Sequence, residues 1–223
     1  MISMAKKDGN YGYLKRQANN RQPRETFLIV CEGEKTEYYY FTCLREDLKS
    51  NNIKIKVKGE GQNTLSLVKK AINIKNNEKS ASYDQVWCVF DKDNYTKEQF
   101  NQAEGLAKEE NIKIAYSNEA FEIWYILHFQ YLDTAIPRNG YGRILTTQMT
   151  KKGLFKEKEK YEKNREDMYE KLNDYQSTAI INAEKLIKRR DELKQHPFDP
   201  YPSTTVHELV RELNKNSRLT ILR

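Results

Sequence analysis

The stretches FLIVCEGEKTE (residues 27–37) and VWCVFDKDN (residues 86–94) decide the fold of this 223-residue chain. Each begins with an apolar, β-prone run that stops at a carboxylate, Glu32 in the first stretch and Asp91 in the second. Such a run predicts a buried parallel strand that delivers its carboxylate to the C-terminal edge of a sheet. In open α/β sheets ligands bind at that edge, where the strand order reverses. We therefore expect the two motifs to meet there.

The sequence around the two motifs alternates between strand-like and helix-like patterns. The apolar spacing predicts helices over about 38–49, 63–72 and 96–107, and strands over 53–57 and 112–116, the first of these near the sheet edge. Thr96 and Gln99 have the spacing of a capping box. This alternation predicts an α/β fold with a mostly parallel sheet flanked by helices. A flavodoxin-like strand order makes the two motif strands neighbours, so that Glu32 and Asp91 meet.

The C-terminal part of the chain has a different character. The segment SNEAFEIWYILHF (117–129) predicts a buried helix opened by Ser117 or Asn118. A loop containing Pro and Gly follows, then charge-dense sequence over about 156–195 that predicts solvated helices, and a capping box of Thr205 and Glu208 before a last short helix. We expect three parts, namely a flexible basic arm over 1–24, a catalytic domain over 25–132 and a helical C-terminal region over 133–223.

Composition restricts the classes of function. The net charge of +7 and the pI of about 9.1 favour an anionic partner such as nucleic acid. The sequence contains neither a run of roughly 20 apolar residues, which a membrane helix needs, nor the apolar core of a signal peptide. Three cysteines, with Cys31 and Cys88 in predicted strands, suggest reduced thiols. We therefore expect a cytoplasmic protein with no membrane contact.

The chemistry that fits the two motifs is metal-assisted reaction at a phosphodiester. Asp91 and Asp93 can share one Mg²⁺ or Mn²⁺ ion, because hard cations prefer oxygen ligands. Glu32 can act as a further ligand or as the general acid/base. Lys35 can meet a phosphate oxygen, and Gly33 allows the backbone to approach the substrate. Taken alone, DKDN is more often a turn and EGEK a surface loop; together, each after a strand, they favour a site.

Other polar residues carry weaker signals. Glu119 or Glu122 could complete a second metal position, although an exposed first helical turn stabilised by the helix dipole is the ordinary explanation for two such glutamates. His128 follows an apolar face and is predicted to be a core histidine. The sequence assigns no role to Glu34, His196 or His207.

At these residues the sequence resembles the RloB-like family. The resemblance rests on CEGEKTE, DKDN, SNEAFEIWYILHF and the PSTTVHELV segment, which occur in the same order and cover nearly the whole chain after residue 24. It implies a Toprim-type catalytic domain, with Glu32 as acid/base or metal ligand and Asp91 and Asp93 as ligands of Mg²⁺. It also implies a place in abortive-infection phage defence, often beside a separate ATPase. The chain itself has no P-loop of the GxxxxGK[ST] kind.

The leading hypothesis is therefore a metal-dependent nuclease that acts on DNA or RNA, including tRNA. One alternative is a phosphatase with a DxD motif, although such enzymes normally place the nucleophilic Asp after the first strand. Another is a non-catalytic subunit that binds nucleic acid or a partner protein, in which the acidic residues are structural. Charge-dense helices often mediate assembly, so a homo-oligomer is also among the expectations.

Overall fold

The computed structural model describes residues 25–49, 53–57, 64–77, 82–92 and 95–215, and gives the side chains of all but 55–57. The strands are β1 (Phe27–Cys31), β2 (Ile53–Val57), β3 (Gln85–Asp91), β4 (Lys113–Asn118) and β5 (Ser203–Thr204). The helices are α1 (Thr36–Asp47), α2 (Thr64–Asn77), α3 (Lys97–Glu109), α4 (Glu122–Leu127), α5 (Tyr141–Lys151), α6 (Met168–Leu172), α7 (Gln176–Glu192) and α8 (Val206–Lys215), with 3-10 turns at Arg138–Gly140 and Asn173–Tyr175. The predicted arm over 1–24 lies outside the described residues.

The five strands form one sheet in the order β2-β1-β3-β4-β5. The first four are parallel, and β5 is antiparallel to β4. This confirms the predicted α/β class and the edge position of the strand over 53–57. It also confirms that β1 and β3 are neighbours. Their register pairs Cys31 with Val89, so the residues that follow β1 lie beside the end of β3 at Asp91.

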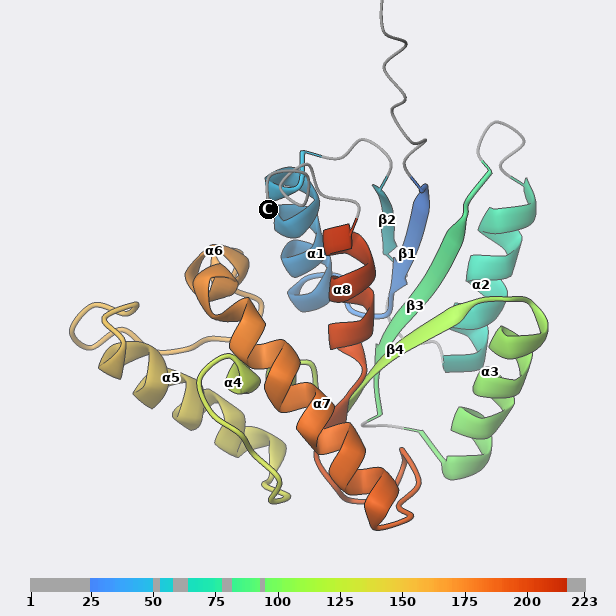
Figure 1. Cartoon of the computed structure of the whole chain (residues 1–223). Coiled ribbons are helices and arrows are strands. Elements are labelled where there is room, and N and C mark those ends of the chain that lie inside the picture. The colour runs from blue at the N-terminus through green and yellow to red at the C-terminus, as the bar shows by residue number, and fades with distance from the viewer. Residues whose placement is uncertain (1–24, 50–52, 58–63, 78–81, 93–94, 216–223) are drawn as a thin grey trace, which may run out of the picture.

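The pleat of the sheet divides its buried side chains between two cores. Alternate residues of a strand point to opposite faces. Phe27, Ile29, Trp87 and Val89 face the core shared with α1, α4, α7 and α8, whereas the residues between them, such as Leu28 and Cys88, face the core shared with α2 and α3. Figure 1 shows the resulting three layers, with α2 and α3 on one side of the sheet and α1 with the C-terminal helices on the other.

The C-terminal region is built differently from the sequence prediction. Residues 156–167 are turns and loop rather than helix, and the long helix α7 begins only at Gln176. Residues Ala179, Ala183 and Leu186 of α7 are fully buried in the same core as β1 and β3, so this helix is not simply solvated. The helices between residues 141 and 215 and the sheet thus share one hydrophobic core.

Two predicted helix caps are wrong for the same reason. Ser117 and Asn118 lie in β4, where Ser117 pairs with Asp91 of β3, and α4 starts later, at Glu122. The hydroxyl of Thr205 accepts from the backbone N–H of Tyr116 and so closes the chain onto β4 instead of capping α8. In both places sheet hydrogen bonds replace the local cap. The capping box of Thr96 and Gln99 on α3 is present as predicted.

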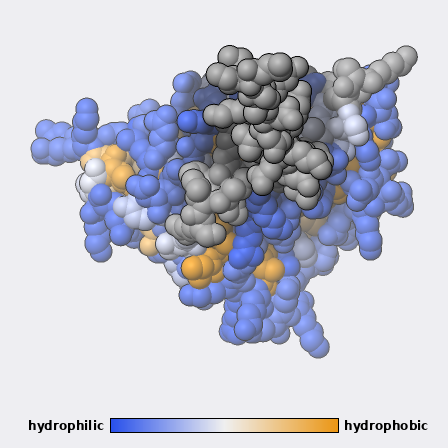
Figure 2. All heavy atoms as spheres, turned by 45° about the horizontal axis from the view of Figure 1, so that its top comes forward, coloured by the Kyte–Doolittle hydropathy of each residue, from blue (hydrophilic) through white to orange (hydrophobic). Residues whose placement is uncertain are grey.

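The face in Figure 2 is largely hydrophilic, and its hydrophobic areas are small and separated. Within the described ranges no helix combines the length and apolarity that crossing a membrane requires.

The shared core predicts that the C-terminal helices and the sheet unfold together. We expect Leu186→Ala to lower the free energy of unfolding by about 2–5 kcal/mol, because it removes a fully buried side chain from α7. Ile181→Ala on the same helix removes a half-exposed side chain and should change it by less than about 0.5 kcal/mol. Denaturant unfolding should be followed by circular dichroism and by the fluorescence of Trp87 and Trp124. A separate helical transition that leaves this fluorescence unchanged would contradict the prediction.

Candidate active site

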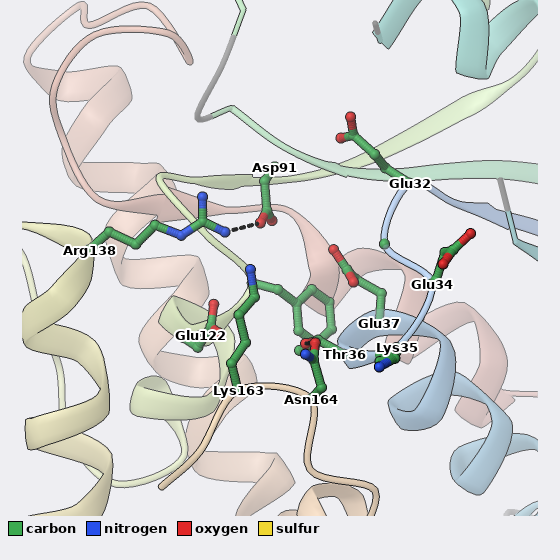
Figure 3. A pocket seen from close by; sticks show the side chains of 12 residues that line it. Glu32, Glu34, Lys35, Thr36, Glu37, Asp91, Glu122, Arg138, Lys163 and Asn164 are labelled. Carbon is green, nitrogen blue, oxygen red and sulfur yellow. Dashed lines mark hydrogen bonds and ion pairs between the residues drawn. The ribbon is translucent and has the colours of Figure 1, made fainter. Parts of the chain in front are cut away.

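A cavity of about 500 Å³ opens at the C-terminal ends of β1 and β3. Its walls come from the loop after β1, the start of α1, the end of β3, the start of α4 and two C-terminal segments. Most of the lining is charged: it consists of Glu32, Gly33, Glu34, Lys35, Thr36, Glu37, Asp91, Phe121, Glu122, Arg138, Lys163 and Asn164. Figure 3 shows these side chains gathered from parts of the chain that are far apart in sequence. This is the sheet edge at which the two motifs were expected to meet.

Asp91 is the acidic centre of the pocket. It is the last residue of β3, and its side chain is 15% exposed. Its Oδ2 lies 3.4 Å from Nη2 of Arg138, while its buried Oδ1 has no hydrogen-bond partner among the described residues. Burial raises the pKa of this carboxyl well above its ordinary value; Glu37 and Glu122 raise it further, and Arg138 opposes them. A buried carboxylate oxygen without a hydrogen-bond partner, on a residue that lines a polar cavity, fits a cation.

Glu37 is the second buried carboxylate and lies in the first turn of α1, 5% exposed. Burial raises its pKa to about 7, and Glu122 adds to the effect, while Lys163 and Arg138 counteract it. A Cβ atom at Gly33 would lie 2.0 Å from Oε2 of Glu37. Gly33 therefore leaves open the space that the Glu37 carboxylate occupies, and a larger residue at position 33 would force that carboxylate to move. The sequence prediction assigned this glycine to the substrate and missed Glu37.

Glu122 is the third buried carboxylate, also 5% exposed, and it begins α4. The hydroxyl of Tyr161 donates to its Oε1 at 3.0 Å. The exposed first turn suggested for this glutamate from sequence is therefore wrong. Tyr161 belongs to the loop between α5 and α6, and its own backbone N–H donates to Oγ1 of Thr146 on α5 at 2.9 Å. A residue of the C-terminal region thus fixes a carboxylate of the pocket.

The same loop supplies further pocket residues and is held in place at several points. The hydroxyl of Thr36 on α1 donates to Oδ1 of Asn164 at 3.2 Å. The guanidinium of Arg165 donates to Asp167 at 2.6 Å and to Glu159 at 2.7 Å, and it also lies over the ring of Phe155. These contacts fix the loop on both sides of Lys163. In Figure 3 the Lys163 side chain extends from the loop toward Asp91 and Arg138.

Glu32, Gly33 and Lys35 line the pocket as expected from the sequence, but Glu32 is not grouped with the three buried carboxylates. Its backbone N–H donates to the carbonyl of Val89, so it continues β1 and has the parity of the residues that face α2 and α3. Figure 3 shows its carboxylate pointing away from Asp91 and Glu37. Lys35 is exposed at the rim. The roles predicted for these residues stay predictions.

Of the remaining candidates, none that the structure describes lines the pocket. Asp93 falls outside the described residues. Glu119 is partly buried and does not line the pocket. It interacts with Tyr141 of α5. His128 is buried in the core as predicted, with Nδ1 2.8 Å from the carbonyl of Trp124. His196 lies in the loop after α7 and His207 lies in α8, and neither lines the pocket.

The donor set fits a divalent cation in chemistry. Within the described residues no three Asp, Glu, His or Cys side chains converge closely enough to hold an ion as they stand. However, Asp91, Glu37 and Glu122 are oxygen donors, and the charge of Glu122 raises the pKa of both Asp91 and Glu37, which is the situation that a hard cation relieves. Five carboxylates and three cationic side chains line the pocket, so two negative charges are in excess when all of these groups are ionised. A divalent ion matches that excess.

Comparison with protein-family models matches residues 27–213 to the RloB-like protein family. The matched range includes both motif strands and every residue that lines the pocket. No curated protein and no solved structure matches the chain.

The crowded carboxylates predict how the stability of the metal-free protein depends on pH. Glu37 has an ordinary pKa of 4.5 and a pKa of about 7 in the folded protein. Between these values the folded state holds a proton that the unfolded state has lost, so the free energy of unfolding should fall as pH rises. A shift of this size corresponds to at most about 3 kcal/mol. The Glu37→Gln variant should lack this decrease and be more stable than the parent at pH 8.

Buried His128 has the opposite effect. Burial lowers its pKa to about 4, so its contribution to the free energy of unfolding increases as pH rises. The measurement is therefore the difference between variant and parent in denaturant unfolding from pH 5 to pH 8, with a chelator present. Glu34→Gln is the matched control, since it removes an exposed carboxylate from the loop just before α1. A difference curve for Glu37→Gln as flat as that for Glu34→Gln would contradict the prediction.

Proposed function

Because the chain belongs to the RloB-like family, we propose that it is a metal-dependent nuclease with a Toprim-type site. The observation that carries the proposal is the crowding of three carboxylates, the buried Glu37 and Glu122 and the mostly buried Asp91, at the C-terminal edge of a parallel sheet. In a nuclease of this kind Mg²⁺ or Mn²⁺ neutralises charge on the phosphoryl oxygens and activates the attacking water. The same pocket contains cationic side chains that can meet a phosphate.

The residues of the chain would divide the remaining work. Asp91, Glu37 and Glu122 would hold the ion, and Asp93 would complete the DxD pair. Tyr161 orients Glu122 through its hydroxyl. Lys35 at the rim would bind a phosphate oxygen, and Glu32 would take or give a proton beside the cavity. The net charge of +7 supports a polyanionic substrate, DNA or RNA.

The biological setting is part of the same proposal. We place the protein in the cytoplasm as an effector of phage defence, with an ATPase as a separate polypeptide, since this chain has no P-loop. Two other functions predict different results at the pocket. A phosphatase would hydrolyse small phosphomonoesters and leave nucleic acid intact. A non-catalytic binding subunit would keep its function when the carboxylates are made neutral.

Cleavage is the first test. The purified protein with Mg²⁺ or Mn²⁺ should cleave at least one member of a panel of plasmid DNA, linear DNA, single-stranded DNA, total RNA and tRNA. Asp91→Asn, Glu37→Gln and Glu32→Gln should each lower the rate at least about a hundredfold, because residues that only support metal ligands already cost about 10–100-fold. Glu109→Gln, an exposed change on α3, is the control. Rates that match this control in all three variants would reject the site.

Metal binding can be tested without any substrate. Saturating Mg²⁺ or Mn²⁺ at a hundredfold excess over its dissociation constant should stabilise the folded protein by about 2.7 kcal/mol. Asp91→Asn should lose most of this gain and should be more stable than the parent without metal, since it removes a carboxylate whose pKa burial and its neighbours raise. Thermal melts with and without each ion measure both effects. An unchanged melting temperature for the parent would count against a metal site.

A further inference from the structure

Arg138 lies where it can interact with both the acidic centre and a substrate. It starts the 3-10 turn before α5, and its side chain is 36% exposed. Its guanidinium reaches Asp91 with one nitrogen–oxygen distance of 3.4 Å, longer than the usual 2.7–2.9 Å of a charge-assisted hydrogen bond. This contact is therefore longer than a strong ion pair, and Arg138 also lines the cavity.

Lys163 is a second cationic residue that lines the pocket. Figure 3 shows its ammonium group near the Asp91–Arg138 pair, although the two cationic residues come from different segments. Its loop is fixed by Tyr161 on Glu122 and by Asn164 on Thr36. Both Lys163 and Arg138 lower the pKa of Glu37, so both act electrostatically on the pocket floor. Neither residue was identified as functional from the sequence.

A cavity lined by carboxylates and by two cationic side chains can bind opposite charges side by side. The carboxylates require a cation, and Arg138 now supplies part of that charge at Asp91. A phosphodiester, by contrast, requires the cations and would be repelled by bare carboxylates. Both ligands can be accommodated when Arg138 turns from Asp91 to the phosphate and leaves Asp91 to the metal.

We propose that Arg138 is shared between Asp91 and the substrate phosphate, and that Arg138 and Lys163 together bind this phosphate. The inference rests on the proposed nuclease function and assigns the phosphate-binding residues of that site to the C-terminal region. It predicts effects of opposite sign for one substitution. Arg138→Gln weakens nucleic-acid binding, because a phosphate contact is lost, and strengthens metal binding, because Asp91 loses its competing partner.

The nucleic-acid arm uses probes that resist cleavage. Fluorescein-labelled single-stranded DNA and RNA oligonucleotides with phosphorothioate linkages are titrated by anisotropy in Ca²⁺ at several salt concentrations. Arg138→Gln and Lys163→Gln should each weaken binding and reduce the slope of log K against log[salt] by about 0.7, the value for one phosphate contact on a single strand. The matched controls are Arg143→Gln on α5 and Lys160→Gln in the same loop, both exposed and outside the pocket lining. If the Arg138→Gln and Lys163→Gln variants bind nucleic acid like their controls, the proposal that these residues bind the phosphate is wrong.

The metal arm uses Mn²⁺ alone, with free ion counted by electron paramagnetic resonance. Arg138→Gln should bind Mn²⁺ at least about fivefold more tightly than the parent, the lower end of coupling between interacting sites. Arg143→Gln should bind it as the parent does. An equal or weaker Mn²⁺ affinity in Arg138→Gln would show that the arginine only supports the pocket, and would overturn the sharing.

The two proposals fail separately. If the parent cleaves no nucleic acid but Arg138→Gln shows both opposite effects, the shared arginine stands and the nuclease does not. If the parent cleaves nucleic acid while Arg138→Gln binds both ligands like the parent, the nuclease stands and the shared arginine is wrong.

Discussion

Repulsion between buried carboxylates is the constraint on which the rest of the site depends. Asp91, Glu37 and Glu122 lie in one cavity, and burial with mutual repulsion raises the pKa of Asp91 and of Glu37. Like charges in a poorly solvated space are tolerated only when something compensates them. Arg138 and Lys163 do so in part. The protein therefore maintains an arrangement that is unfavourable by itself, as expected of a site that binds a cation.

The pleat of the sheet decides which carboxylates meet. Asp91 has the parity of Trp87 and Val89 and therefore points to the face covered by α1 and α4. Glu32 follows the opposite parity of β1, so the position beside Asp91 falls to Gly33. The absence of a side chain there leaves the space that Glu37 fills from the first turn of α1. Gly33 and Glu37 together thus place a carboxylate near Asp91, which Glu32 at the end of β1 does not do.

The strands and the meeting of the two motifs could be predicted from sequence, because an apolar run ending in a carboxylate has a direct physical meaning. Glu37 could have been found, since it stands in the quoted motif, but its position in a helical turn hid its proximity to Gly33. Arg138 and Lys163 could not, because their approach to Asp91 depends on tertiary packing. The loop over 156–167 was predicted as helix for a related reason, since its charged residues suit a helix but serve contacts such as that of Arg165 with Asp167.

The C-terminal region is consequently part of the site. Its helix α7 shares a core with the sheet, and its loop fixes Glu122 through Tyr161 and brings Lys163 over the carboxylates. The strands alone would present repelling acids with little compensation. Because the compensating charges come from two segments outside the sheet, a shift of these segments would alter metal and phosphate binding together without moving the sheet. A partner that contacts the C-terminal helices could therefore act on the chemistry through Arg138 and Lys163 while the carboxylates stay in place.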